Sequence, residues 1–75
     1  MKKFDNNKMR ARRIEMEMSQ EDLARTTGLS VFTISRTESG ASAGMRVETL
    51  VILAKALLYD PEDLLIETEE GEPNE

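Results

Sequence analysis

The sequence contains neither cysteine nor histidine, and its longest apolar run, Leu50 to Ala54, is five residues long. Without cysteine no disulfide can form, which excludes a stapled secreted scaffold. The two absences together exclude a structural zinc site and a histidine-based catalytic triad, so we expect no metal and no cofactor. The apolar run is far too short to span a membrane, and no apolar segment follows the basic N-terminus. We therefore expect a cytoplasmic protein with no signal peptide and no membrane partner.

The charges of the chain are distributed unevenly. The 75 residues allow one small domain, and its net charge of −5 argues at first against nucleic acid as a partner. Residues 1–46, however, hold nine basic residues against six acidic ones, a net charge of +3, whereas residues 47–75 hold one against nine, a net charge of −8. The front half can therefore face an anionic partner. The four positive charges between Lys8 and Arg13 also fit a solvated helix face, and both interpretations stay open.

Capping and turn signals predict five short helices, at about residues 7–17, 20–26, 31–39, 47–58 and 61–66, and no strand. The expected N-caps are Asn6 or Asn7, Ser19 with Asp22 completing a capping box, Ser30, and Asp60 before Pro61. Gly28 is expected to turn the chain with a positive φ, and Gly40 to stop the third helix. The fold class is therefore all-α: a domain over residues 1–66, followed by an acidic, disordered tail over residues 67–75.

The predicted helix over residues 47–58 carries an apolar stripe that Leu53 borders, and Ile52 lies outside it. The stripe is expected to comprise Val47, Leu50, Val51, Ala54, Leu57 and Leu58. Ile52 lies nearly opposite this stripe, and a single exposed isoleucine is common. The other interpretation is a patch for self-association, formed by Ile52, Leu58, Tyr59 and Ile66.

The segment from Gln20 to Thr37 has the spacing of a helix-turn-helix motif. Ala24 is small where the two helices have to cross closely, and Gly28 makes the turn. Leu29 and Ile34 attach the second helix to the first. This arrangement presents the second helix on the surface, where the major groove of DNA can receive it.

Over about residues 6–66 the sequence resembles the lambda-repressor-like, Cro-type (XRE) helix-turn-helix domain. The resemblance is carried by Ser19–Ala24, Gly28–Ser30, Thr33–Gly40 and Val47–Leu57, followed by Asp63–Leu65. It implies a compact five-helix DNA-binding fold and a structural ion pair between Arg13 and Glu38. This domain class commonly binds DNA as a twofold dimer through its C-terminal helices.

The resemblance also implies which residues contact DNA. Base contacts are implied for Val31, Phe32, Ser35 and Arg36. Among them, Arg36 would take a guanine through two hydrogen bonds, and Val31 and Phe32 would pack on thymine methyls. Phosphate contacts are implied for Gln20, Ser30, Thr33, Ser39 and Ser42, supplemented by the basic residues Lys8, Arg10 and Arg12. The alternatives are that Val31 and Phe32 belong to the core, and that Arg36 pairs with a neighbouring acid.

The sequence departs from the family pattern at several places. Glu17 and Leu58 stand where the family usually has a glycine at a helix end, so either they accept a strained φ or the helices end differently. The recognition helix also lacks the glutamine or asparagine that often reads adenine.

Two functions remain from the sequence. The first is sequence-specific binding of double-stranded DNA by a small transcriptional regulator, a repressor that acts as a homodimer on an inverted-repeat operator. The alternative is an antitoxin or protein-interaction module of the same fold, whose acidic tail binds a basic partner such as a toxin. We expect no enzyme, because the sequence offers no clustered carboxylates on a predicted concave face and no phosphate-cradling loop.

Overall fold

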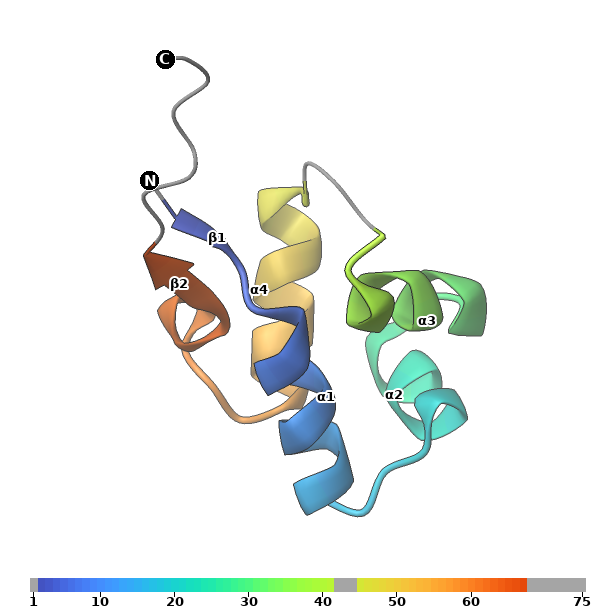
Figure 1. Cartoon of the computed structure of the whole chain (residues 1–75). Coiled ribbons are helices and arrows are strands. Elements are labelled where there is room, and N and C mark those ends of the chain that lie inside the picture. Colours follow the sequence, from blue (N-terminus) through green and yellow to red (C-terminus); the bar gives the residue numbers. More distant parts are fainter. Residues whose placement is uncertain (1, 42–44, 68–75) are drawn as a thin grey trace.

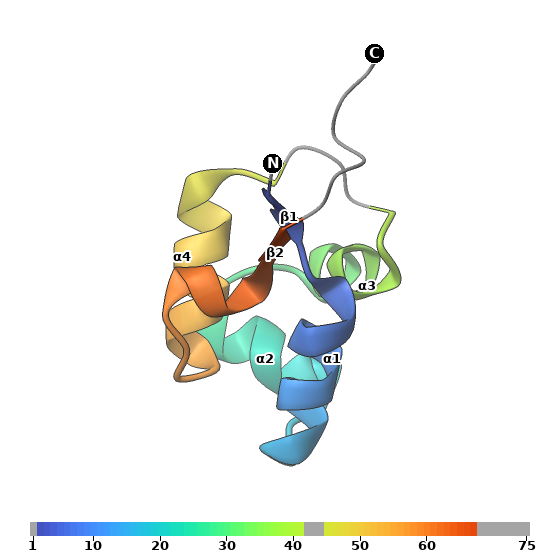
Figure 2. The ribbon, with the colours of Figure 1, turned by 60° about the vertical axis from the view of Figure 1, so that its left-hand side comes forward.

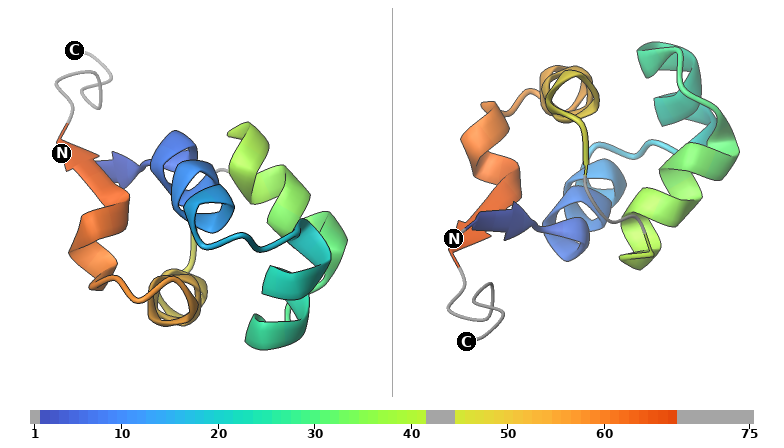
Figure 3. Two further views of the ribbon diagram at one scale, coloured as in Figure 1. Left: turned by 90° about the horizontal axis from the view of Figure 1, so that it is seen from below. Right: turned by 90° about the horizontal axis from the view of Figure 1, so that it is seen from above.

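Four α-helices pack around one small core in the computed structural model, which describes residues 2–41 and 45–67. The elements are β1 (Lys2–Phe4), α1 (Asn6–Glu15), α2 (Gln20–Thr27), α3 (Val31–Ser39), α4 (Val47–Ala56), the 3₁₀ helix η1 (Pro61–Leu64) and β2 (Leu65–Glu67). Helices α2 and α3 lie at one side of the molecule, and β1, β2 and η1 lie at the opposite side (Figures 1 and 3). None of the helices within the described ranges is long and apolar enough to cross a membrane.

The prediction of five α-helices and no strand is wrong at the two ends of the domain. The predicted fifth helix is a 3₁₀ helix that stops at Leu64, and the next residues form β2, which pairs antiparallel with β1 so that Lys3 lies opposite Ile66 (Figure 2). The helix begins as predicted, with Asp60 at the N-cap and Pro61 as its first residue, and the Asp60 N–H also donates to the Asp63 carboxylate at 2.8 Å. The backbone N–H and C=O groups after Leu64 then find hydrogen-bond partners in β1. These partners replace the ones that a continued helix would supply.

The predicted acidic tail lies mostly outside the described residues. Residues 68–75 lie outside the described residues, and Glu67, the first residue of the predicted tail, is the last residue of β2.

The core lies between the four α-helices and η1. Its buried apolar residues are Met9, Leu23, Ala24, Ile34, Leu53, Ala54, Leu57 and Leu64. On α4 the expected stripe is wrong at three positions, because Val47 and Leu58 are each 74% exposed and Val51 is 43% exposed, whereas Leu53, expected only at its border, is fully buried. Leu58 lies beyond the last residue of α4, so its direction no longer follows the helical repeat.

Helix α1 ends in a Schellman motif whose left-handed residue is Glu17 rather than glycine. Glu17 has a φ of 59°. Its N–H donates to the Ile14 carbonyl at 2.9 Å, and the Met18 N–H donates to the Arg13 carbonyl at 3.0 Å. These bonds satisfy carbonyls that the helix end leaves open, while the Glu17 Cβ costs about 1–2 kcal/mol in this conformation.

Helix α4 ends in the same way. Leu58 has a φ of 59°, its N–H donates to the Lys55 carbonyl at 3.1 Å, and the Tyr59 N–H donates to the Ala54 carbonyl at 2.8 Å. Of the two possibilities that the sequence left open, the structure shows the strained φ at both helix ends.

We predict that Glu17→Gly stabilises the domain by about 0.5–1 kcal/mol. Glycine removes the Cβ strain but has more conformational freedom in the unfolded chain, so part of the gain is lost. Thermal unfolding should show a midpoint higher by several degrees, since about 1 kcal/mol shifts it by roughly 4–8 °C in a domain of this size. Glu17→Ala is the control, because it removes the charge and keeps the Cβ. An equal gain in both variants would contradict the role of strain.

Candidate nucleic-acid interface

The turn between α2 and α3 has the geometry of a helix-turn-helix. Gly28 ends α2 with a φ of 81°, and its N–H donates to the Ala24 carbonyl at 2.8 Å. Ser30 then caps α3, and its Oγ accepts the Thr33 N–H at 3.0 Å. The predicted turn at Gly28 and the predicted N-cap at Ser30 are therefore confirmed. Ala24 is buried where the helices approach, with 7% of its surface exposed.

The start of α2 is fixed by the predicted capping box. The Ser19 N–H donates to the Asp22 carboxylate at 2.8 Å, and the Asp22 N–H donates to the Ser19 hydroxyl at 2.9 Å. The hydrogen bonds with the backbone and side chain of Ser19 hold the pKa of Asp22 below its usual value. A lowered carboxyl pKa stabilises the fold above the pKa of the unfolded chain, and this contribution is lost as the pH falls through the folded value. The box is therefore intact at neutral pH.

Helix α3 has two different faces. Phe32 is 69% exposed and Val31 is 38% exposed, and Ser35 and Arg36 are exposed beside them. The opposite face is buried and consists of Ile34, Thr37 and Glu38. The four residues with implied base contacts thus lie on one outer face, outside the core.

Arg36 is held by an aromatic ring rather than by an acid. Its Cζ lies 5.5 Å from the centroid of the Phe32 ring, one helical turn earlier. Within residues 2–41 and 45–67 Arg36 forms no ion pair. The alternative in which a neighbouring acid neutralises Arg36 is therefore not the arrangement of the structure, and its N–H groups stay available to a ligand.

The inner face of α3 is fixed by a buried ion pair. Arg13 Nε lies 2.5 Å from Glu38 Oε2, and Arg13 Nη2 donates to Glu38 Oε1 at 3.1 Å. The two side chains are only 11% and 3% exposed. Gln20 Nε2 also donates to Glu38 Oε1, at 3.1 Å, and Asn6 Nδ2 donates to the Glu38 carbonyl at 2.9 Å. Glu38 thereby joins α3 to α1 and to the start of α2.

The residues with implied phosphate contacts differ in how many of their hydrogen-bond donors are already used within the domain. Gln20 gives one amide hydrogen to Glu38 and keeps the second. Ser30 donates its proton to Thr33 Oγ1 at 2.9 Å, so the Thr33 hydroxyl proton stays available. Ser39 donates to the Arg36 carbonyl at 2.9 Å. Ser42 lies outside the described residues.

The basic residues of α1 lie on different sides of that helix. Arg10 is exposed and lies within about 60° of Asn6 and Arg13, the two residues that reach α3. Lys8 and Arg12 lie about 200–240° around the helix axis from Asn6. The three residues therefore do not form one cluster.

Lys8 and Arg12 contact Tyr59 instead of facing α3. Lys8 Nζ lies 5.2 Å and Arg12 Cζ 4.7 Å from the centroid of the Tyr59 ring. Arg12 Nε also donates to the Leu57 carbonyl at 2.9 Å, next to the end of α4. This arrangement assigns Lys8 and Arg12 to the packing of α1 against the end of α4.

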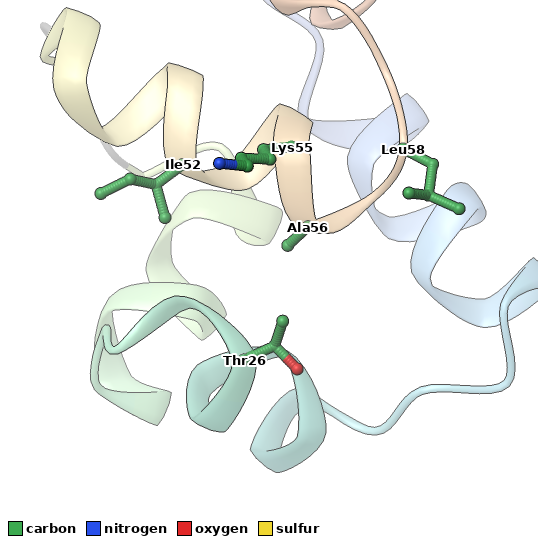
Figure 4. A pocket seen from close by; sticks show the side chains of 5 residues that line it. All are labelled: Thr26, Ile52, Lys55, Ala56 and Leu58. Carbon is green, nitrogen blue, oxygen red and sulfur yellow. The ribbon is translucent and has the colours of Figure 1, made fainter.

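The patch expected for self-association is divided in the structure. Ile52 and Leu58 line one open pocket of about 460 Å³ between α2 and α4, together with Thr26, Lys55 and Ala56 (Figure 4). Tyr59 lies against α1, and Ile66 lies in β2 opposite Lys3. Lys55 is the one ionisable residue of the pocket, which therefore lacks a pair of groups for acid–base chemistry. Across the described part of the chain, no three carboxylates are placed to hold a metal ion.

Sequence reasoning missed the role of Asn6. It was expected as a possible N-cap of α1, but Asp5 is the cap, and its Oδ1 accepts the Lys8 N–H at 3.0 Å. Asn6 instead reaches the end of α3, where its amide also lies 3.4 Å from the point that a Cβ on Gly40 would occupy. No local signal identifies this contact, because its partners are 32 residues apart.

An exposed second helix, supported on its inner side and preceded by a tight glycine turn, defines a helix-turn-helix domain of the kind that reads DNA in the major groove. The chain belongs to the Cro/C1-type HTH DNA-binding domain family, whose model matches residues 8–70. No curated protein matches the sequence.

Solved structures show the same fold. The chain is 31% identical to the P22 c2 repressor protein, solved with synthetic operator 9T, with a TM-score of 0.75 over 83% of this chain and 92% of that one. It is 29% identical to the restriction-modification controller protein C.AhdI from Aeromonas hydrophila, with a TM-score of 0.74 over 79% and 88%. SinR, a regulator of biofilm formation, is 19% identical with a TM-score of 0.74 over 79% and 94%, a likeness of fold alone.

We predict that Glu38→Gln lowers the free energy of unfolding by about 3–5 kcal/mol. The substitution leaves the charge of Arg13 buried without its counter-charge. Urea unfolding followed by circular dichroism measures the loss. Glu15→Gln is the matched control, since the Arg12–Glu15 pair at 3.1 Å is on the surface, with Glu15 68% exposed, and should change stability by less than about 0.5 kcal/mol. A similar small effect for Glu38→Gln would contradict the central role of this ion pair.

Proposed function

We propose that the protein is a sequence-specific regulator that binds double-stranded DNA by inserting α3 into the major groove. The observation that carries this proposal is the outer face of α3, where Val31, Phe32, Ser35 and Arg36 project while Glu38 anchors the opposite face. A helix whose inner face is fixed can present its outer side chains to base edges without reorganising. Arg36 has the planar fork that pairs with guanine O6 and N7.

Residues on and beside α3 would contact the DNA phosphates. Gln20 and Thr33 each keep a free proton to donate, and Arg10 is exposed on the side of α1 that reaches α3. We leave Lys8 and Arg12 out of this set because they contact Tyr59. Such contacts fix the orientation of the protein on the duplex, and base contacts supply the sequence preference.

Repression by a dimer is the finer part of the proposal. The 31% identity to the P22 c2 repressor, solved with an operator, supports a repressor that acts on an operator. We propose a second copy of the chain as the occupant of the apolar surface around Ile52 and Leu58, which are 39% and 74% exposed. A twofold dimer would place two α3 helices in successive major grooves about 34 Å apart, on an inverted repeat.

Selection of DNA from a random library, with purified protein and sequencing of the bound fraction, tests the function. We expect enrichment of an inverted repeat. Arg36→Ala should then lower affinity for the enriched site by about 1–3 kcal/mol and relax the preference at one base pair, as measured by fluorescence anisotropy. Failure to enrich any sequence would contradict specific DNA binding.

The matched pair Arg10→Ala and Lys8→Ala tests the phosphate contacts. Both variants remove one positive charge from α1, but only Arg10 is on the side that reaches α3. Arg10→Ala should weaken binding to all DNA alike and reduce the slope of log affinity against log salt by about 1 for each bound copy, and Lys8→Ala should leave that slope nearly unchanged. Equal slopes in the two variants would contradict the assignment.

We predict that Ile52→Glu prevents dimerisation without unfolding the monomer. A carboxylate in the apolar contact would have to be desolvated without a partner. Analytical ultracentrifugation at high micromolar concentration, with and without the enriched DNA, measures the oligomeric state, and circular dichroism checks the fold. Glu48→Gln, an exposed change on the same helix, is the control. A wild-type protein that stays monomeric with and without DNA would contradict the dimer.

A further inference from the structure

The contact between Phe32 and Arg36 joins the two largest side chains on the outer face of α3. Phe32 is 69% exposed, and the Arg36 Cζ lies 5.5 Å from its ring centroid, within the range of a cation–π contact. A guanidinium that lies over a ring keeps its N–H groups, which point outward in its own plane, free to donate. The ring is therefore a support for Arg36 as well as an apolar surface of its own.

This contact limits which combination of neighbouring bases the two side chains can contact together. When Arg36 pairs with guanine, its guanidinium lies in the plane of that base. A ring over which the guanidinium lies is then out of this plane, on the side of a neighbouring base pair. The ring carries no hydrogen-bonding group, and the apolar feature of the major-groove edge is the C5 methyl group of a pyrimidine.

We propose that Phe32 and Arg36 act as one reading unit for a guanine that is flanked by a 5-methylpyrimidine. This inference rests on the proposed DNA binding. The same C5 methyl group occurs in thymine and in 5-methylcytosine, so the proposal names a chemical group rather than one base. Cytosine methylation beside the guanine would thus strengthen binding to a site that carries cytosine at this position.

The test compares DNA duplexes that differ by one methyl group. The enriched site is synthesised with thymine or with deoxyuridine beside the contacted guanine, and affinities are measured by fluorescence anisotropy. We expect deoxyuridine to weaken binding about fourfold for each half-site, the loss typical of one buried methyl group. A second pair of duplexes carries cytosine or 5-methylcytosine at that position, and the methylated duplex should bind more tightly by a similar factor.

Two protein variants assign the effect to the ring. Phe32→Ala should bind the thymine and deoxyuridine duplexes equally and should also discriminate less between guanine and adenine, because Arg36 loses its support. Val31→Ala, a change at the neighbouring exposed apolar residue, should keep the fourfold ratio. Thermal unfolding confirms that Phe32→Ala is folded, which is expected because the side chain lies outside the core.

The outcomes separate the two proposals. If the library yields no enriched sequence, DNA binding itself fails. If a site is enriched and bound but deoxyuridine binds as well as thymine, or if Val31→Ala rather than Phe32→Ala removes the ratio, only the reading unit is overturned.

Discussion

The buried carboxylate of Glu38 is the constraint on which the arrangement of the first three helices depends. It receives the guanidinium of Arg13 and the amide of Gln20, and the carbonyl of the same residue receives Asn6. Burying two opposite charges costs about as much as their attraction returns, so such a pair contributes little net stability, whereas losing one partner is costly. The directional bonds therefore mainly select one relative position of α1, α2 and α3. That position determines which face of α3 is turned outward.

The outer face of α3 shows the consequence. The Phe32 side chain contributes little hydrophobic free energy to folding, because most of its surface remains exposed to water in the folded domain. A single exposed apolar residue is ordinary on a protein surface. A phenylalanine that supports the one arginine of the same face is a more specific arrangement, since it limits the directions that the arginine fork can take. The inner face provides rigidity, and the outer face carries the side chains that we propose to contact the duplex.

The sequence predicted the features that depend on neighbours within one helical turn. The caps at Ser19 and Ser30 and the turn at Gly28 were predicted because their hydrogen bonds close within four residues. The pairing of Lys3 with Ile66 was missed because it joins opposite ends of the chain and leaves no local period. The proposed base-reading face was expected from the family resemblance. The contacts of Lys8 and Arg12 with Tyr59, however, depend on how α1 packs against the end of α4, which no sequence spacing specifies.

The same three-dimensional arrangement explains how a chain with a net charge of −5 can be suited to an anionic partner. Asp60, Glu62 and Asp63 belong to η1 and its N-cap, which lie at the opposite side of the molecule from α2 and α3 (Figure 1). Because salt screens exposed charges over about 10 Å, acids at the opposite side of the domain oppose a duplex at α3 less than acids beside α3 would. They repel a duplex that approaches from their own side. Acidity placed there therefore favours the proposed orientation, in which α3 faces the DNA.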